Sequence, residues 1–78
     1  MNKIENKVLK LIKKILNNKK KLGKETILTN SFLDSYNMLI LIGNLEKEFK
    51  IKFNEKDLHY KNFTNIVQIS KIVKKNVK

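Results

Sequence analysis

Three stretches of the chain repeat their hydrophobic residues with the period of an α-helix. In the first, residues 4–16, the aliphatic side chains fall on one arc of a helical wheel and the lysines fall on the other. The aliphatic arc contains Ile4, Val8, Leu9, Leu11, Ile12, Ile15 and Leu16. The lysine arc contains Lys3, Lys7, Lys10, Lys13 and Lys14. We therefore expect an amphipathic first helix that frays into NNKKKLG, where Gly23 is a helix stop signal.

The second helical pattern begins at Asp34 or Ser35 and extends to about Lys50. Asp34 is a favourable N-cap, because its carboxylate can accept a backbone N–H at the positive end of the helix. The wheel assigns Met38, Leu39, Leu41, Ile42, Leu45 and Phe49 to the core. Tyr36, Ile40 and Gly43 fall together outside that arc. This second face is either an exposed apolar surface for a partner or ligand, or a face buried against another helix.

The long loop over residues 24–34 also carries large apolar side chains. They are Ile27, Leu28, Phe32 and Leu33, so we expect the loop to pack against the core. Loops of this length without regular structure are often functional.

The third helical pattern begins after Thr64 or Asn65, either of which can cap it. Its expected core residues are Ile66, Ile69, Ile72 and Val73. Before it, we expect a short extended segment at residues 51–53 and a connection at residues 59–63. Between these two, Asn54 and Asp57 form an approximate capping box, which predicts a brief helical turn. The sequence thus predicts a single all-α domain: a bundle of three main helices plus one short helix, with a long loop between the first two.

The charge of the chain is strongly positive and uneven. Eighteen lysines and seven acids give +11, of which residues 1–24 contribute +8 (nine lysines, one acid) and residues 25–78 contribute +3 (nine lysines, six acids). Such a balance suggests nucleic acid or an anionic membrane as partner. However, the chain has no arginine, and lysine, asparagine and isoleucine make up half of it, which indicates a compositional bias such as AT-rich codons produce. The longest apolar run, residues 38–42, is too short to span a bilayer, so we expect a cytoplasmic protein.

The residues for most catalytic chemistry are missing. There is no cysteine, and a single histidine, His59, cannot form a metal cluster. No GxSxG motif surrounds a serine, and the two glycines, Gly23 and Gly43, form no phosphate-binding loop. We therefore predict that the chain is not an enzyme. Ser35 is instead a candidate for covalent modification, because a phosphate ester at a helix start lies beside free backbone N–H groups.

The stretch FLDSYNMLILIGNLEKEFKIKFNEKDL, followed by NFTNIVQISKIV, resembles the acyl carrier protein family, which includes peptidyl and D-alanyl carriers. The resemblance rests on Leu33, Asp34 and Ser35 at a helix start, L-E-x-E-F at 45–49, and I-x-F at 51–53. It implies that a phosphopantetheinyl transferase attaches the 4′-phosphopantetheine of coenzyme A to Ser35, beside Asp34. The terminal thiol of this arm would hold an acyl or aminoacyl group as a thioester, so a chain without cysteine would still carry thiol chemistry.

The resemblance also indicates where partner enzymes would dock. Fatty-acid carriers have acids beside the serine, whereas this chain has Asn37, Ile40 and Gly43, and Tyr36 replaces the usual leucine. Together with Leu33, these residues form the expected docking surface. We expect a monomeric carrier that serves a loading ligase and acceptor enzymes, more in a specialised pathway than in general fatty-acid synthesis. The alternative is a basic helical nucleic-acid-binding module, and the amphipathic KVLKLIKKIL also fits an anionic membrane surface.

Overall fold

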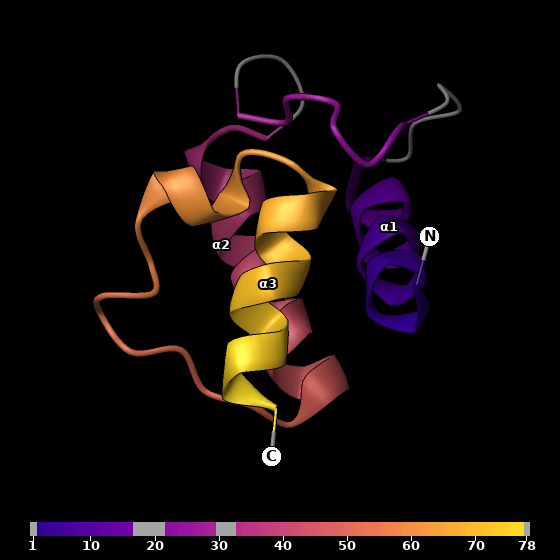
Figure 1. Ribbon diagram of the computed structural model, residues 1–78. Helices are drawn as coiled ribbons and strands as arrows, with labels where there is room; N and C mark the ends of the chain where they lie inside the picture. Colours follow the sequence, from indigo (N-terminus) through magenta and orange to yellow (C-terminus); the bar gives the residue numbers. More distant parts are fainter. Residues whose placement is uncertain (1, 17–21, 30–32, 78) are drawn as a thin grey trace.

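The computed structural model describes residues 2–16, 22–29 and 33–77, which form three α-helices and one short 3-10 helix (Figure 1). Helix α1 spans Lys3–Leu16, α2 spans Ser35–Phe49, η1 spans Tyr60–Phe63 and α3 spans Ile66–Asn76. Helix α1 packs against both α2 and α3, and η1 packs against α3. The predicted all-α bundle with a long loop between the first two helices is confirmed. None of the described helices is both long and apolar enough to cross a membrane.

The helix ends are set by side chains that cap them. Asp34 Oδ1 accepts the backbone N–H three residues further on at 2.8 Å, and Asn65 Oδ1 does the same at 2.9 Å, which confirms both predicted N-caps. Lys50, the C-cap that follows the last residue of α2, adopts the left-handed conformation with φ 54°. At the start of α1, Asn2 and Glu5 form a reciprocal capping box that the sequence reasoning did not single out (2.8 and 3.0 Å).

The core is built from apolar side chains of every helix and of the long loop. The buried hydrophobic residues are Val8, Ile12, Leu22, Leu28, Leu33, Leu41, Leu45, Phe53, Phe63, Ile66, Ile69, Ile72 and Val73. They include all four residues predicted for α3 and the centre of the predicted arc of α1. The remaining aliphatic residues of α1 are partly buried at the edge of this cluster. The periodicity therefore identified the inward faces of α1 and α3 correctly.

The prediction for Leu39 was wrong. It was assigned to the core of α2, but its side chain is 70% exposed. Leu39 precedes the fully buried Leu41 by two positions, which places the two side chains about 160° apart around the helix. Because α1 packs on the side of α2 that carries Leu41, Leu39 is left facing solvent.

The segment between α2 and α3 also differs from the prediction. The brief helical turn expected at Asn54–Asp57 is a non-helical turn, and the short helix lies instead at residues 60–63, which were expected to be a connection. The predicted Asn54–Asp57 capping box is nevertheless present, with N–H to oxygen distances of 3.0 and 3.2 Å. Phe63 explains the position of η1, because its ring is buried edge-to-face on Phe53, with centroids 5.9 Å apart.

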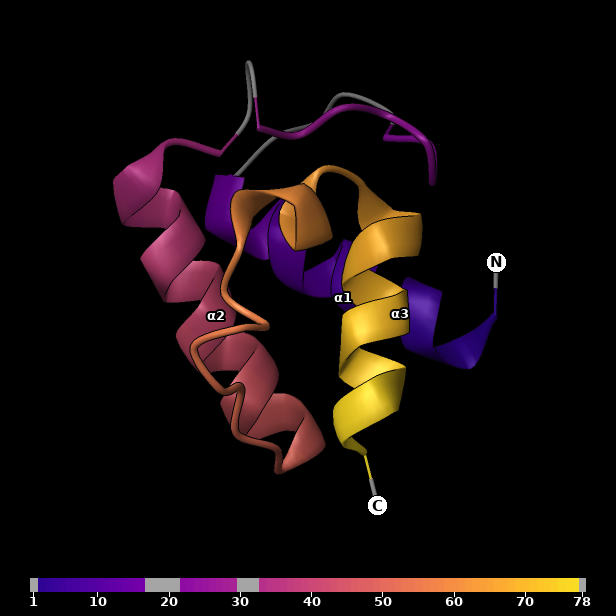
Figure 2. The same ribbon diagram turned by 60° about the vertical axis from the view of Figure 1, so that its left-hand side comes forward.

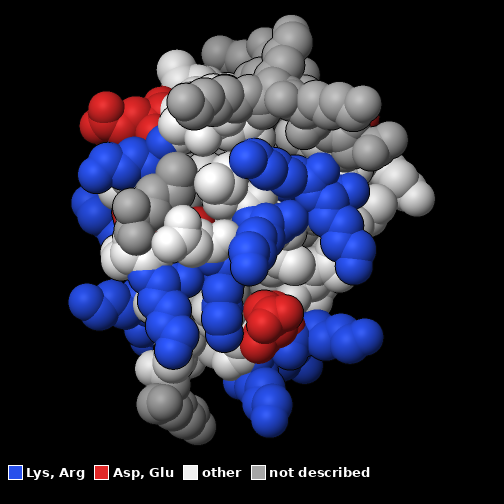
Figure 3. Space-filling model, turned by 90° about the vertical axis from the view of Figure 1, so that its right-hand side faces the viewer, with Lys and Arg blue, Asp and Glu red and all other residues white. Residues whose placement is uncertain are grey.

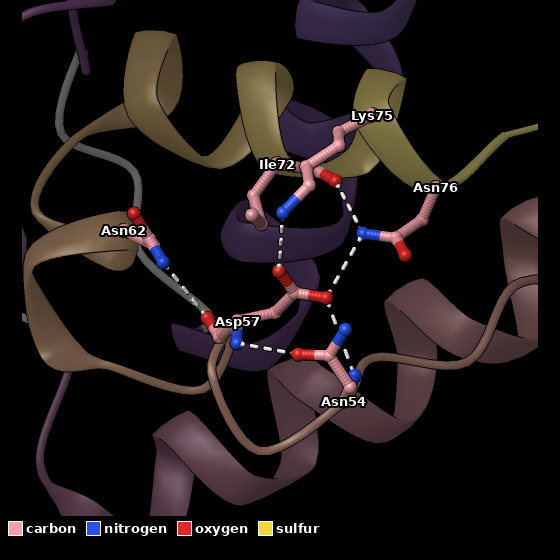
Figure 4. Close-up of polar contacts among 6 residues, drawn as sticks. All are labelled: Asn54, Asp57, Asn62, Ile72, Lys75 and Asn76. Atoms are coloured by element: carbon pink, nitrogen blue, oxygen red, sulfur yellow. Dashed lines mark hydrogen bonds and ion pairs between the residues drawn. The ribbon is translucent and has the colours of Figure 1, made fainter.

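Asp57 fastens this segment to the end of α3 (Figure 4). Its buried carboxylate accepts hydrogen bonds from Lys75 Nζ at 3.2 Å and from Asn76 Nδ2 at 3.3 Å. Its backbone carbonyl accepts a hydrogen bond from Asn62 Nδ2 at 3.0 Å. Burial alone raises the pKa of Asp57, but the backbone hydrogen bond from Asn54, the side-chain hydrogen bonds and the charge of Lys75 outweigh it and hold that pKa below its ordinary value. Asp57 is thus a structural anion that holds η1 in place.

Candidate functional site

The long loop holds the start of α2 in a fixed position. Its backbone is hydrogen-bonded to the η1–α3 connection and to the first turn of α3, since Leu28 N–H donates to the Thr64 carbonyl at 2.7 Å and Val67 N–H donates to the Lys24 carbonyl at 3.2 Å. Leu33 N–H then donates back to the Leu28 carbonyl at 2.8 Å. The described part of the loop crosses the end of the bundle in both ribbon views (Figure 2).

The loop is packed down, as predicted, through some of its apolar residues. Leu28 and Leu33 are buried, together with Leu22 just before the expected loop. Ile27 is 52% exposed, so the prediction was wrong for that side chain. Phe32 lies outside the described residues. Because Leu33 immediately precedes Asp34 and Ser35, its burial fixes the approach of the chain to the first turn of α2.

Ser35 is exposed at the first position of α2 and opens onto a hollow of about 340 Å³. The hollow is lined by Thr29, Leu33, Asp34, Ser35, Met38 and Tyr60. Three separate parts of the chain thus meet at this point: the loop, the first turn of α2, and η1. The sequence reasoning missed Thr29 and Tyr60, because no local pattern places either of them beside Ser35.

The first turn of α2 gives the Ser35 hydroxyl a setting that suits an attached phosphate. A helix N-terminus presents unpaired N–H groups and a positive partial charge, and no acid lies within the first turn itself. The carboxylate of Asp34 is engaged in capping. The hollow beside the hydroxyl supplies apolar surface from Leu33 and Met38 and the ring of Tyr60 for the rest of a pantetheine arm. The residues present therefore fit a phosphopantetheine group.

The residues predicted for docking are placed in different environments. Tyr36 is 72% exposed and Gly43 is exposed with open space around it, whereas Ile40 and Asn37 are half-buried. Leu33 is buried and contributes to the wall of the hollow. Exposed Leu39 adds to the same side of α2 as Tyr36 and Gly43. We call Tyr36, Leu39, Ile40 and Gly43 the α2 stripe.

His59 takes no part in the hollow. It is exposed, stacks on Tyr60 with centroids 4.9 Å apart, and its Nδ1 accepts the Lys61 N–H at 3.3 Å. The ring therefore caps η1 and supports Tyr60, which in turn lines the hollow.

A small helical bundle that presents an exposed serine at the start of its second helix has the architecture of a carrier domain. Residues 6–73 match the family described as phosphopantetheine attachment site. The chain belongs to this family, and membership implies a covalently attached 4′-phosphopantetheine. Domains of this family are generally non-catalytic carriers that work with a phosphopantetheinyl transferase and partner enzymes. No curated protein and no solved structure matches the chain.

Proposed function

We propose that Ser35 is the attachment site of the phosphopantetheine arm and that the chain carries an acyl or aminoacyl group on it as a thioester. The observation that carries this proposal is the exposed Ser35 hydroxyl at the helix start, opening onto the hollow between the loop, α2 and η1. In the attachment reaction, the serine oxygen bonds to the phosphorus that bears the pantetheine half of coenzyme A. The phosphoanhydride P–O bond to the adenosine half breaks, 3′,5′-ADP leaves, and a base of the transferase accepts the serine proton.

Partner enzymes dock, in this proposal, on the α2 stripe next to Ser35. Tyr36 and Leu39 are 72% and 70% exposed there, and contiguous exposed apolar surface marks sites where partners bind. The first turn of α2 offers no acid to a basic partner surface. We therefore assign the carrier to a specialised pathway with an aminoacyl or unusual acyl cargo.

The attachment site is tested by incubating the purified chain with coenzyme A and a broad-specificity phosphopantetheinyl transferase and measuring the intact mass. We expect the unaltered chain to gain the mass of one phosphopantetheine and Ser35→Ala to gain none. Ser31→Ala provides the matched control, since it removes the neighbouring serine and should leave the mass gain intact. A mass gain in Ser35→Ala, or an unmodified Ser35 in protein isolated from its natural source, would contradict the assignment.

The pathway assignment needs a separate comparison. The modified chain and a typical acidic carrier are offered to a fatty-acid malonyl transferase under identical conditions. We expect the acidic carrier to be loaded much faster. Equal loading of the two carriers would refute the specialised role while leaving Ser35 as the attachment site.

A further inference from the structure

A second surface, separate from the Ser35 site, is formed by the solvent side of α1. Its exposed lysines are Lys3, Lys7, Lys10, Lys13 and Lys14, which we call the α1 lysine face. Four of them follow at intervals of four, three and four residues, so they line up along the helix over about 16 Å. Figure 3 shows lysine side chains spread over this side of the molecule, with acidic surface among them at the lower centre.

The neighbouring helices extend the positive charge of this face. Lys71 and Lys74 of α3 border the first turn of α1, where they share a shallow hollow with Asn2, Ile4 and Glu5. On the other side, Lys47 of α2 borders Lys14. The surface thus spans three helices.

The acids of the chain do little to neutralise this surface. Glu5 and Asp57 are buried, and Glu46 accepts the backbone N–H of Phe53 at 3.0 Å. Within the described residues, Glu48 is the one acid that pairs with the α1 lysine face, through Lys7 at 3.9 Å. A compositional bias explains a high lysine content, but within the described residues Lys3, Lys10, Lys13 and Lys14 of the α1 lysine face form no salt bridge, so most of its charge is left without an acid partner.

We propose that the α1 lysine face binds the carrier to the surface of an anionic lipid leaflet. Val8 and Ile12 at the centre of the apolar arc are fully buried in the core, so α1 cannot insert that arc into lipid, and the contact is electrostatic. A flat array of flexible lysines suits a plane of lipid phosphates. Base-specific and single-strand nucleic-acid sites use arginine contacts and stacking aromatic rings. The chain has no arginine and its exposed tyrosines, Tyr36 and Tyr60, lie at the Ser35 site, so the α1 lysine face lacks the groups for such recognition.

This orientation leaves the carrier site accessible. In Figure 1, α1 lies at the right of the bundle, whereas α2 begins toward the upper left. A carrier held to a leaflet through the solvent side of α1 therefore keeps the start of α2, with Ser35, off the lipid-facing side. The proposal goes beyond the carrier function and needs no modification of Ser35, so either can fail without the other.

The test is co-sedimentation of the unmodified chain with vesicles of phosphatidylcholine alone or of phosphatidylcholine with phosphatidylglycerol. The variant Lys3→Gln, Lys10→Gln, Lys14→Gln removes three charges from the α1 lysine face. A second variant removes the same number from exposed positions between α2 and α3: Lys52→Gln, Lys56→Gln, Lys61→Gln. Circular dichroism confirms that both variants are folded, and Lys10→Gln alone provides the same test at a smaller amplitude.

We expect binding to the anionic vesicles only. Each lysine at an anionic surface contributes about fivefold in affinity, so the α1 variant should bind about 100-fold more weakly and Lys10→Gln about fivefold. The variant with the three substitutions between α2 and α3 should lose much less affinity for the anionic vesicles than the α1 variant, because the charges that it removes lie farther from the lipid. Equal losses in the two triple variants, no binding to anionic vesicles at low salt, or tighter α1-dependent binding to duplex DNA at the same ionic strength would each overturn the proposal.

Discussion

The sharpest test of the fold compares two adjacent residues of the long loop, Leu28 and Ile27. Leu28 is fully buried, whereas Ile27 is 52% exposed, and replacement by alanine removes three carbon atoms from either side chain. At about 0.8 kcal/mol per buried methylene, Leu28→Ala loses about 2.4 kcal/mol of transfer free energy, and the cavity left behind brings the cost to about 2–5 kcal/mol. Ile27→Ala loses about half of that transfer term, about 1 kcal/mol, and leaves no closed cavity.

These losses are large relative to the total stability of such a domain. A chain of 78 residues has a free energy of unfolding of about 4–12 kcal/mol. At about 4–8 °C per kcal/mol for a domain of this size, Leu28→Ala should lower the melting temperature by about 8–40 °C, whereas Ile27→Ala should lower it by about 4–8 °C. Urea denaturation followed by far-UV circular dichroism measures both free energies. If the losses in free energy of unfolding of the two variants agree within about 0.5 kcal/mol, the loop does not pack as described. Loop packing would then not be what fixes the position of Ser35.

Three further predictions follow from other parts of the structure. The pKa of Asp57 is lower in the folded state than in the unfolded state, where it is about 3.9, so the ionised carboxylate stabilises the folded state. This contribution to the free energy of unfolding is fully present above the unfolded pKa and is lost as pH falls through the folded pKa. Urea titrations toward low pH should show this loss, and Asp57→Asn should flatten it; an unchanged acid limb would contradict the Lys75 contact. The buried Ser70 hydroxyl has no hydrogen-bond partner among the described residues, so Ser70→Ala should be neutral or stabilise by up to about 1 kcal/mol in thermal melts, and a clear destabilisation would reveal a bound partner. Leu39→Ala should change the melting temperature little but slow loading by the partner ligase, with exposed Lys56→Ala as control; unchanged loading would remove Leu39 from the docking surface.

The sequence determined the helices and their ends because those depend on neighbouring residues. The period of apolar side chains fixed the inward faces of α1 and α3, and the carboxylate of Asp34 and the amide of Asn65 reach their own backbone N–H groups three residues on. The Asn54–Asp57 capping box could be predicted from the sequence because its two residues are only three positions apart. The apolar pattern and the capping residue Asp34 predicted a helix start at Asp34 or Ser35, and the structure has Ser35 at the first position of α2.

Only the tertiary structure decided which surfaces are covered. Apolar residues are spread over most sides of the first half of α2, so the exposure of Leu39 depends on which side of α2 its neighbours in the fold leave open. The position of η1 depends on the burial of Phe63 against Phe53, ten residues away, and the role of Asp57 depends on Lys75 from the far end of the chain. These contacts join residues that are distant in sequence, and no local pattern encodes them. The hollow at Ser35 is decided in the same way, because it exists only where the loop, α2 and η1 meet.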